Sequence, residues 1–213
     1  MTTEKRDFNK EAALWDENPV RVKLSQDVAR TISNKITLTP EMDVMDFGCG
    51  TGLLTMQIQP FVRSITGVDN SEGMLEKFNS KVNKLNLNNV NSSFIDLDNG
   101  DILKGNYDLI LSNMTLHHIK EIQSLFNQFH NVIKPGGYLC LCDLDLENGK
   151  FHNDNTGVFH NGFSREVLKK TFADTGFVNI QDITAAEVTK PTVDGELITF
   201  SIFLITGQKK QNL

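Results

Sequence analysis

A short apolar segment runs directly into a glycine-rich loop, and a helical pattern follows at once. Asp43–Phe47 has the composition of a buried β-strand, and Gly48–Gly52 (GCGTG) follows it without a spacer. Glycine lets a backbone approach a ligand closely, and a helix N-terminus offers unpaired N–H groups. A strand, a glycine loop and a helix in this order predict an α/β fold that binds a ligand at the loop.

The same alternation of strand and helix patterns continues through most of the chain. Further strands are expected at Ser64–Asp69, Ser92–Leu97, Tyr107–Ser112 and Tyr138–Leu144, each separated from the next by a helical pattern or a turn. This alternation predicts a parallel sheet with helices on both faces. Two long β-prone stretches, Phe177–Val188 and Leu197–Thr206, have no helix between them and are expected to pair as an antiparallel hairpin.

Charge and hydropathy limit the class of protein. The chain has 21 Lys and Arg against 27 Asp and Glu, a net charge of −6, which argues against a protein that neutralises the phosphates of a nucleic acid. No apolar run is long enough to span a membrane, and the charged N-terminus does not resemble a signal peptide. Cys140 and Cys142 alternate within one apolar run, so they are expected to be buried and reduced, and the protein to be cytoplasmic.

An acidic residue stands at the expected distance beyond the glycine loop. Asp69 ends the second expected strand, 19 residues after Gly50, where a carboxylate can accept hydrogen bonds from both hydroxyls of a ribose. Leu53 replaces the third glycine of the nicotinamide fingerprint, and no Lys-Ser/Thr pair follows the loop, which excludes a P-loop. The combination of loop, strand and Asp69 predicts a nucleoside-containing ligand.

Five motifs in order resemble those of class I S-adenosylmethionine-dependent methyltransferases. They are Asp46–Gly52 (DFGCGTG), Gly67–Ser71 with Met74, Phe94–Leu97 (FIDL), Tyr107–Ile110 (YDLI) and Lys134–Gly137 (KPGG). The similarity is greatest to the broad group of small-molecule enzymes that includes the ubiquinone and menaquinone C-methyltransferases.

The resemblance implies a doubly wound α/β fold. Its mostly parallel, seven-stranded sheet would have the order 3-2-1-4-5-7-6, with strand 7 antiparallel and helices on both faces. We expect one methyltransferase domain made of an N-terminal helical lid (1–38), a cofactor-binding core (41–145), an inserted substrate segment (146–163), and a C-terminal helix with a β-hairpin (164–213).

The resemblance also implies which residues hold S-adenosyl-L-methionine. Gly48, Cys49 and Gly50 would pack under the ribose and the methionine part, and Asp46 would face the methionine ammonium. The other members of the predicted cofactor set are Asp69 for the ribose, Asn70 and Met74 beside the adenine, Asp96 and Leu97 at the adenine edge, and Asn113 at the methionine end. Asp96 has an alternative role, the capping of the turn that follows it.

Three neighbourhoods are predicted to shape the pocket for a small-molecule acceptor. The first is the N-terminal helix with Phe8 and Trp15, the second is the segment after the fourth strand with His117, and the third is the inserted segment with His152 and His160. His117 and His160 are the candidate general bases. No metal is predicted, because the spacing of His152, Asp154 and His160 fits no recognised site.

The predicted function is methyl transfer from S-adenosyl-L-methionine to a small molecule by in-line displacement. It depends mainly on positioning, because the methyl group is already activated. One alternative is a protein that binds the cofactor without catalysing transfer. Another is a nicotinamide-dependent oxidoreductase, which Leu53 and Asp96 disfavour.

Overall fold

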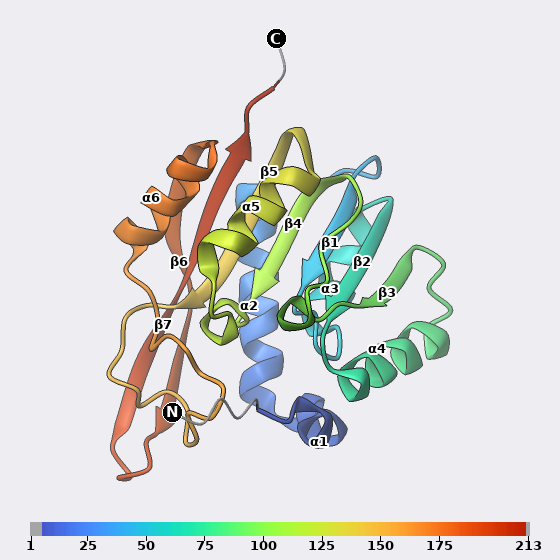
Figure 1. The fold of residues 1–213 in the computed structure, drawn as a ribbon. Coiled ribbons are helices and arrows are strands. Elements are labelled where there is room, and N and C mark those ends of the chain that lie inside the picture. Colours follow the sequence, from blue (N-terminus) through green and yellow to red (C-terminus); the bar gives the residue numbers. More distant parts are fainter. Residues whose placement is uncertain (1–5, 212–213) are drawn as a thin grey trace.

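Seven strands form one continuous sheet in the computed structural model, which describes residues 6–211. The order is β3-β2-β1-β4-β5-β7-β6, with helices on both faces (Figure 1). The strands are β1 Asp43–Phe47, β2 Ser64–Asp69, β3 Val90–Phe94, β4 Tyr107–Asn113, β5 Ile133–Leu144, β6 Phe177–Pro191 and β7 Leu197–Lys209. The pairs among β1 to β5 are parallel and both pairs of β7 are antiparallel, which confirms the predicted fold class and strand order.

The helices follow the predicted alternation. They are α1 Phe8–Glu11, α2 Pro19–Lys35, α3 Leu53–Ile58, α4 Glu72–Lys84, α5 Ile122–Val132 and α6 Arg165–Thr175, with short 3-10 turns such as Ala12–Glu17 and Leu116–His118. Asn18 caps α2, because its Oδ1 accepts a hydrogen bond from the Val20 N–H at 2.9 Å ahead of Pro19. Among the described residues, no helix is both long and apolar enough to cross a bilayer.

The apolar side chains of β1 alternate between two cores. Val44 belongs to the core that α2 covers, with Val28 and Ile32, whereas Met45 belongs to the opposite core with the phenylalanines of α5 and α6. A parallel strand that is buried on both faces is mostly apolar, as Val44, Met45 and Phe47 are here. Within β1 only Asp46 is both polar and buried.

Several strand boundaries differ from the prediction. β3 ends at Phe94 and not at Leu97, because Asp96 caps a 3-10 turn instead of continuing the ladder. β5 begins at Ile133, before the Pro135-Gly136 turn signal, since Ile133 already pairs with Tyr107 across an irregular register. β6 and β7 are each longer than expected because they pair with one another over most of their length.

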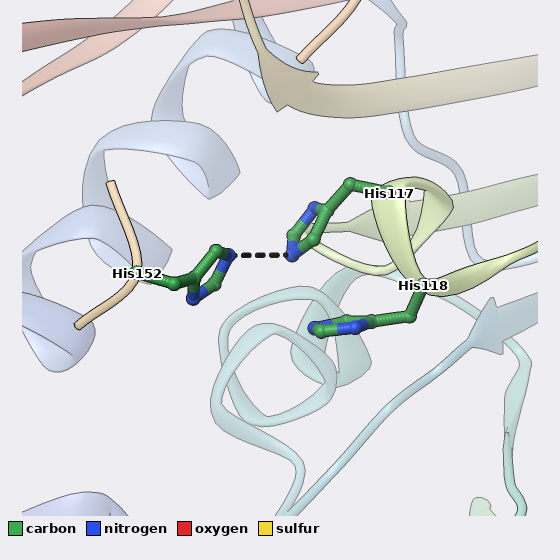
Figure 2. Close-up of side chains that lie close together, drawn as sticks. All are labelled: His117, His118 and His152. Carbon is green, nitrogen blue, oxygen red and sulfur yellow. Dashed lines mark hydrogen bonds between the residues drawn. The ribbon is translucent and has the colours of Figure 1, made fainter. Parts of the chain in front are cut away.

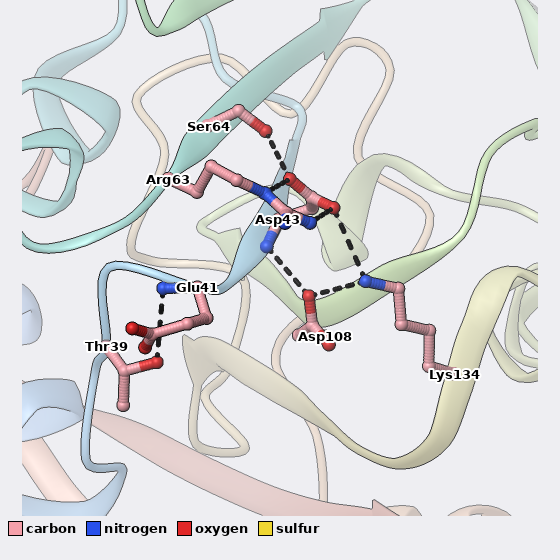
Figure 3. Close-up of polar contacts among 7 residues, drawn as sticks. All are labelled: Thr39, Glu41, Asp43, Arg63, Ser64, Asp108 and Lys134. Carbon is pink, nitrogen blue, oxygen red and sulfur yellow. Dashed lines mark hydrogen bonds and ion pairs between the residues drawn. The ribbon is translucent and has the colours of Figure 1, made fainter.

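Charged side chains fasten the sheet at the amino ends of its strands (Figure 3). Asp43, the first residue of β1, accepts hydrogen bonds from Arg63 and, at 2.8 Å, from the Ser64 hydroxyl, and its own N–H donates to Asp108. Lys134 bridges the carboxylates of Asp43 and Asp108. The Arg63 guanidinium holds the pKa of Asp43 well below its ordinary value. This network aligns β1, β2 and β4 from the edge opposite to their carboxyl ends.

Residue 48 must be a glycine because the segment after β4 lies directly against its backbone. Its φ is +68°, and a Cβ at this position would lie 2.2 Å from Oγ1 of Thr115. The segment after β4 can therefore approach the end of β1 only if residue 48 has no side chain.

We expect Gly48→Ala to lower the free energy of unfolding by about 2–4 kcal/mol, through backbone strain and the clash with Thr115. Gly100→Ala is the matched control, since Gly100 has a φ of +85° and nothing lies within 4 Å of its would-be Cβ. This control should cost only about 1 kcal/mol. Urea unfolding followed by circular dichroism measures both, and equal losses would contradict the steric argument.

Candidate active site

A cavity of about 650 Å³ lies at the carboxyl ends of β1, β2 and β4. These strands end level with one another, since Phe47 pairs with both Val68 and Ser112. The residues that follow them are therefore neighbours. All ten residues of the predicted cofactor set line the cavity: Asp46, Gly48, Cys49, Gly50, Asp69, Asn70, Met74, Asp96, Leu97 and Asn113.

Asp69 shapes the glycine loop while it faces the cavity. Its Oδ2 accepts a hydrogen bond from the Gly50 N–H at 2.8 Å, and its Oδ1 accepts one from the Ser71 N–H at 2.9 Å. Burial raises the pKa of Asp69, and these backbone N–H groups oppose that rise. Because each carboxylate oxygen has two acceptor sites, the same group can accept two further hydrogen bonds from a ligand.

Asp46 is a buried carboxyl group with one strong partner. The Thr55 hydroxyl donates to its Oδ2 at 2.5 Å. Burial raises the pKa of Asp46 to about 6, and the nearby charge of Asp69 adds to the rise. A cationic group in the cavity would stabilise the ionised form of Asp46.

Asn113 carries a polar atom that the protein leaves without a partner. Its Oδ1 is buried and accepts no hydrogen bond from any described residue, although an unsatisfied buried acceptor costs about 1–3 kcal/mol. Asn113 lines the cavity at the end of β4. The residues therefore fit a ligand that brings N–H donors, as the ammonium of S-adenosylmethionine does.

Asp96 caps the turn after β3. Its side chain accepts hydrogen bonds from the Asp98 N–H at 3.0 Å and from the Asn99 side chain at 2.9 Å. The alternative role that the sequence left open is thus present in the structure. Asp96 also lines the cavity, so the capping role does not remove it from the site.

The N-terminal segment lies over the glycine loop and the start of α4. Asn9 accepts hydrogen bonds from the Ser71 hydroxyl and the Gly73 N–H, and Asp16 accepts one from the Thr51 hydroxyl at 2.6 Å. Phe8 and Trp15, which were predicted for the acceptor pocket, both line the cavity. The first five residues of the predicted lid lie outside the described residues.

Three histidines from two segments meet in the cavity (Figure 2). His117 and His118 come from the turn after β4, and His152 comes from the inserted segment before α6. Nε2 of His117 and Nε2 of His152 are 3.2 Å apart, and the His117 and His118 ring centroids are 4.2 Å apart. His118 also donates from Nδ1 to the Gly157 carbonyl oxygen at 2.7 Å.

Asp143 fixes the orientation of His117. Its Oδ1 lies 2.7 Å from Nδ1 of His117, and both side chains are almost completely buried. Burial alone would raise the pKa of Asp143, but its contacts with His117 and the hydrogen bond from the Leu144 N–H lower it below its ordinary value. The ionised Asp143 accepts the Nδ1 proton of His117, which leaves the lone pair of that ring on Nε2.

The hydrogen bonds of this cluster determine which ring nitrogen of His152 and of His117 carries the proton. Arg6 lies 3.2 Å from Nδ1 of His152 and can only donate, so Nδ1 of His152 is an acceptor and its proton is on Nε2. That N–H then donates to Nε2 of His117. Burial lowers the pKa of His152 to about 3 and that of His118 to about 4, so both rings are neutral near pH 7. The three rings also lie close enough together for each to offer one nitrogen to a metal ion.

His160, the second candidate base, does not line the cavity. Its Nε2 contacts the Ile119 carbonyl oxygen at 2.9 Å, and its ring packs at 5.1 Å from Phe163. The structure therefore brings His117 and His152 together but places His160 among the supports of the loop.

Several charged or titratable residues that line or support the site were not predicted from the sequence. They are Arg6, Arg21, His118, Asp143 and Lys190. Asp143 had a signal, because an acid within the apolar run Tyr138–Leu144 must have a partner when the strand is buried.

Comparison with known proteins agrees with this geometry. The sequence pattern of a methyltransferase domain family matches residues 38–187. The chain belongs to the S-adenosylmethionine-dependent methyltransferase family. It is an α/β methyltransferase domain whose cofactor is S-adenosylmethionine.

Relatives show the range of this methyltransferase family. An uncharacterised methyltransferase of Schizosaccharomyces pombe is 30% identical over 182 residues, covering 78% of this chain and 64% of that protein. The malonyl-[acyl-carrier protein] O-methyltransferase of Calditerrivibrio nitroreducens is 29% identical over 161 residues, covering 70% of this chain and 58% of that enzyme. The chain thus matches about three-fifths of the length of these two relatives.

Solved structures share the methyltransferase fold. YcgJ from Bacillus subtilis superposes with a TM-score of 0.73 at 16% identity, over 87% of this chain and 99% of that one. An S-adenosylmethionine-dependent methyltransferase from Aquifex aeolicus gives a TM-score of 0.69 at 19% identity, over 94% and 97% of the two chains.

The hydrogen-bond chain predicts the tautomers of two histidines at pH 7. His117 should carry its proton on Nδ1 and His152 on Nε2, and ¹⁵N-correlated NMR of the imidazole rings distinguishes these forms. In Asp143→Asn the preference of His117 should be lost, while His130, which lies outside the cluster, serves as the unaffected control. A proton on Nδ1 of His152 would contradict the chain and favour a metal ligand in its place.

Proposed function

We propose that this domain transfers a methyl group from S-adenosylmethionine to a small-molecule acceptor bound beside His117. The supporting observation is that one cavity is lined both by the predicted cofactor residues and by His117, whose ring contacts the buried Asp143. The cavity volume of about 650 Å³ is in the range of sites for small molecules.

The cofactor half of the cavity follows the chemistry of its carboxylates. Asp69 would accept from the ribose hydroxyls, Asp46 and the unpartnered Asn113 Oδ1 would face the methionine ammonium, and Asp96 would lie at the adenine edge. When bound, S-adenosylmethionine supplies a methyl group already activated on its sulfonium sulfur, which passes to the nucleophilic atom of the acceptor and leaves S-adenosylhomocysteine. The protein mainly has to align the acceptor in line with that carbon, at about 3–3.5 Å.

His117 is proposed as the general base of the acceptor half. The Nδ1–H group donates to Asp143, so Nε2 is left to accept a proton. In the structure that lone pair receives the N–H of His152, and an acceptor O–H or N–H that enters the cavity would take the place of His152. Asp143 is a positioning residue, because it holds the ring in this tautomer and stabilises the imidazolium after proton transfer.

Two segments outside the seven-stranded sheet are proposed to select the acceptor. The N-terminal lid (1–38) contributes Phe8 and Trp15, and the inserted segment (146–163) contributes His152. Phe8 contacts both Trp15 and His118 edge to face, at centroid distances of 6.0 and 5.1 Å. The acceptor would therefore enter between the lid and the inserted segment, next to His117.

The proposed function predicts release of S-adenosylhomocysteine when the protein is incubated with S-adenosylmethionine and a panel of small hydroxyl and amino compounds. For an accepted substrate, His117→Gln should lower kcat about 10²- to 10⁴-fold, because the acceptor proton then has no base. Asp143→Asn should also lower kcat and shift the pH profile, since the tautomer of His117 is no longer fixed. Mass spectrometry of released S-adenosylhomocysteine measures both.

His160→Gln is the matched control, since its ring lies outside the cavity, and it should retain turnover. Full turnover by His117→Gln would refute the general base but leave methyl transfer intact. Tight cofactor binding with no release from any acceptor would instead indicate a protein that binds S-adenosylmethionine without transferring its methyl group.

A further inference from the structure

Three cationic side chains line the acceptor side of the cavity. Arg6 comes from the N-terminal segment, Arg21 from α2, and Lys190 from β6, at the far end of the chain. Such a gathering is unexpected for a protein with a net charge of −6, because like charges repel unless something compensates them.

One carboxylate, that of Glu11, forms ion pairs with two of these cations. Glu11 lies 2.6 Å from Nε of Arg6 and 3.3 Å from a terminal nitrogen of Arg21. The Arg21 guanidinium also stacks on the Trp15 ring, 3.6 Å from its centroid, which fixes its plane beside the cavity. Each guanidinium has five N–H donors, so donors remain for a ligand.

Lys190 has no carboxylate partner among the ion pairs of residues 6–211. Its ammonium donates to the Phe151 carbonyl oxygen and lies 4.6 Å from the centroid of the Phe151 ring. Burial lowers the pKa of Lys190, and the charges of Arg21 and Arg6 lower it further, while the charge of Glu147 acts in the opposite direction. The three cations therefore face one another closely enough to interact.

Few carboxylates of the protein oppose these cations directly. Among the described residues, Glu11 is the carboxylate within ion-pair distance of Arg6 and Arg21. Glu147 acts on Lys190 only through its charge at longer range. Asp154 also lines the cavity, but it lies on the exposed inserted segment, where water screens its charge.

We propose that Arg6, Arg21 and Lys190 form a subsite for the carboxylate of an organic-acid acceptor. The planar fork of a guanidinium matches the two oxygens of a carboxylate, and the Lys190 ammonium adds a third cationic donor group. The inference rests on the proposed function and names its substrate class.

The subsite lies close to the proposed base. Arg6 contacts His152 at 3.2 Å, and His152 contacts His117 at 3.2 Å. An acid held by Arg6 and Lys190 can therefore reach Nε2 of His117 only with a nucleophile a few bonds from its carboxylate. The favoured acceptors are hydroxy acids or amino acids with an apolar or aromatic body, since Phe8, Trp15 and Phe151 line the same space.

Isothermal titration of small monocarboxylates into protein saturated with S-adenosylhomocysteine tests the subsite without turnover. The probes are acetate, lactate and benzoate, each against its neutral amide. At low ionic strength we expect saturable millimolar binding of at least one carboxylate, and at least tenfold weaker binding of its amide. Lys190→Gln should weaken that binding tenfold or more, and the matched control Lys23→Gln, an exposed lysine on α2, should not change it.

The affinity for S-adenosylhomocysteine distinguishes failure of the carboxylate subsite from failure of the proposed function. It should be unchanged in Lys190→Gln, which also shows that the variant is folded. If no carboxylate binds saturably up to tens of millimolar while S-adenosylhomocysteine still binds, the subsite is refuted and the cofactor assignment stands. If carboxylates bind only to the cofactor-free protein, the three cations serve the methionine carboxylate and not an acceptor. If the wild-type protein does not bind S-adenosylhomocysteine, the proposed function itself is refuted.

Discussion

The parallel pairing of β1 with β2 on one side and β4 on the other is the constraint on which the site depends. Because Phe47 is level with Val68 and Ser112, the next residues, Gly48, Asp69 and Asn113, lie together at one edge. The network around Asp43 holds the opposite ends of the same strands in register. A slip of one residue in either pair would turn Asp46 out of its face and separate Asp69 from the Gly50 N–H.

The cavity is divided electrostatically between its two sides. Asp46, Asp69 and Asp96 lie on the side of the glycine loop, and Arg6, Arg21 and Lys190 lie on the side of the lid and the inserted segment. A cofactor with an ammonium, a sulfonium and a sugar diol suits the first side. The net charge of −6 gave no indication of the cationic side, because a charge sum carries no information about where the charges lie.

Local signals in the sequence predicted the parts of the fold and site that depend on neighbouring residues. The alternation of strands with helices and the position of Asp69 both follow from spacing along short segments. Asp143 was missed although its apolar surroundings marked it, because its partner His117 lies on a different strand end. Arg6 and Lys190 carried no signal at all, since only the folded chain brings the N-terminus and β6 to the same cavity. His160 is of a residue type that is common in catalytic sites, but in the structure its ring contacts the Ile119 carbonyl oxygen and supports a loop.

We propose that strand-end carboxylates, led by the buried Asp46, hold the ammonium of the cofactor's methionine end. Burial raises the pKa of Asp46 to about 6, so the group is largely protonated below that pH and cannot pair with an ammonium. Calorimetry of S-adenosylhomocysteine binding from pH 4.5 to 8 tests this most directly. The account predicts that affinity rises with pH, by at most about tenfold per unit below the pKa, and that protons are released on binding. In Asp46→Asn binding should be weaker and this rise should be lost. An affinity that does not change with pH, or one that rises equally in Asp46→Asn, would contradict the account.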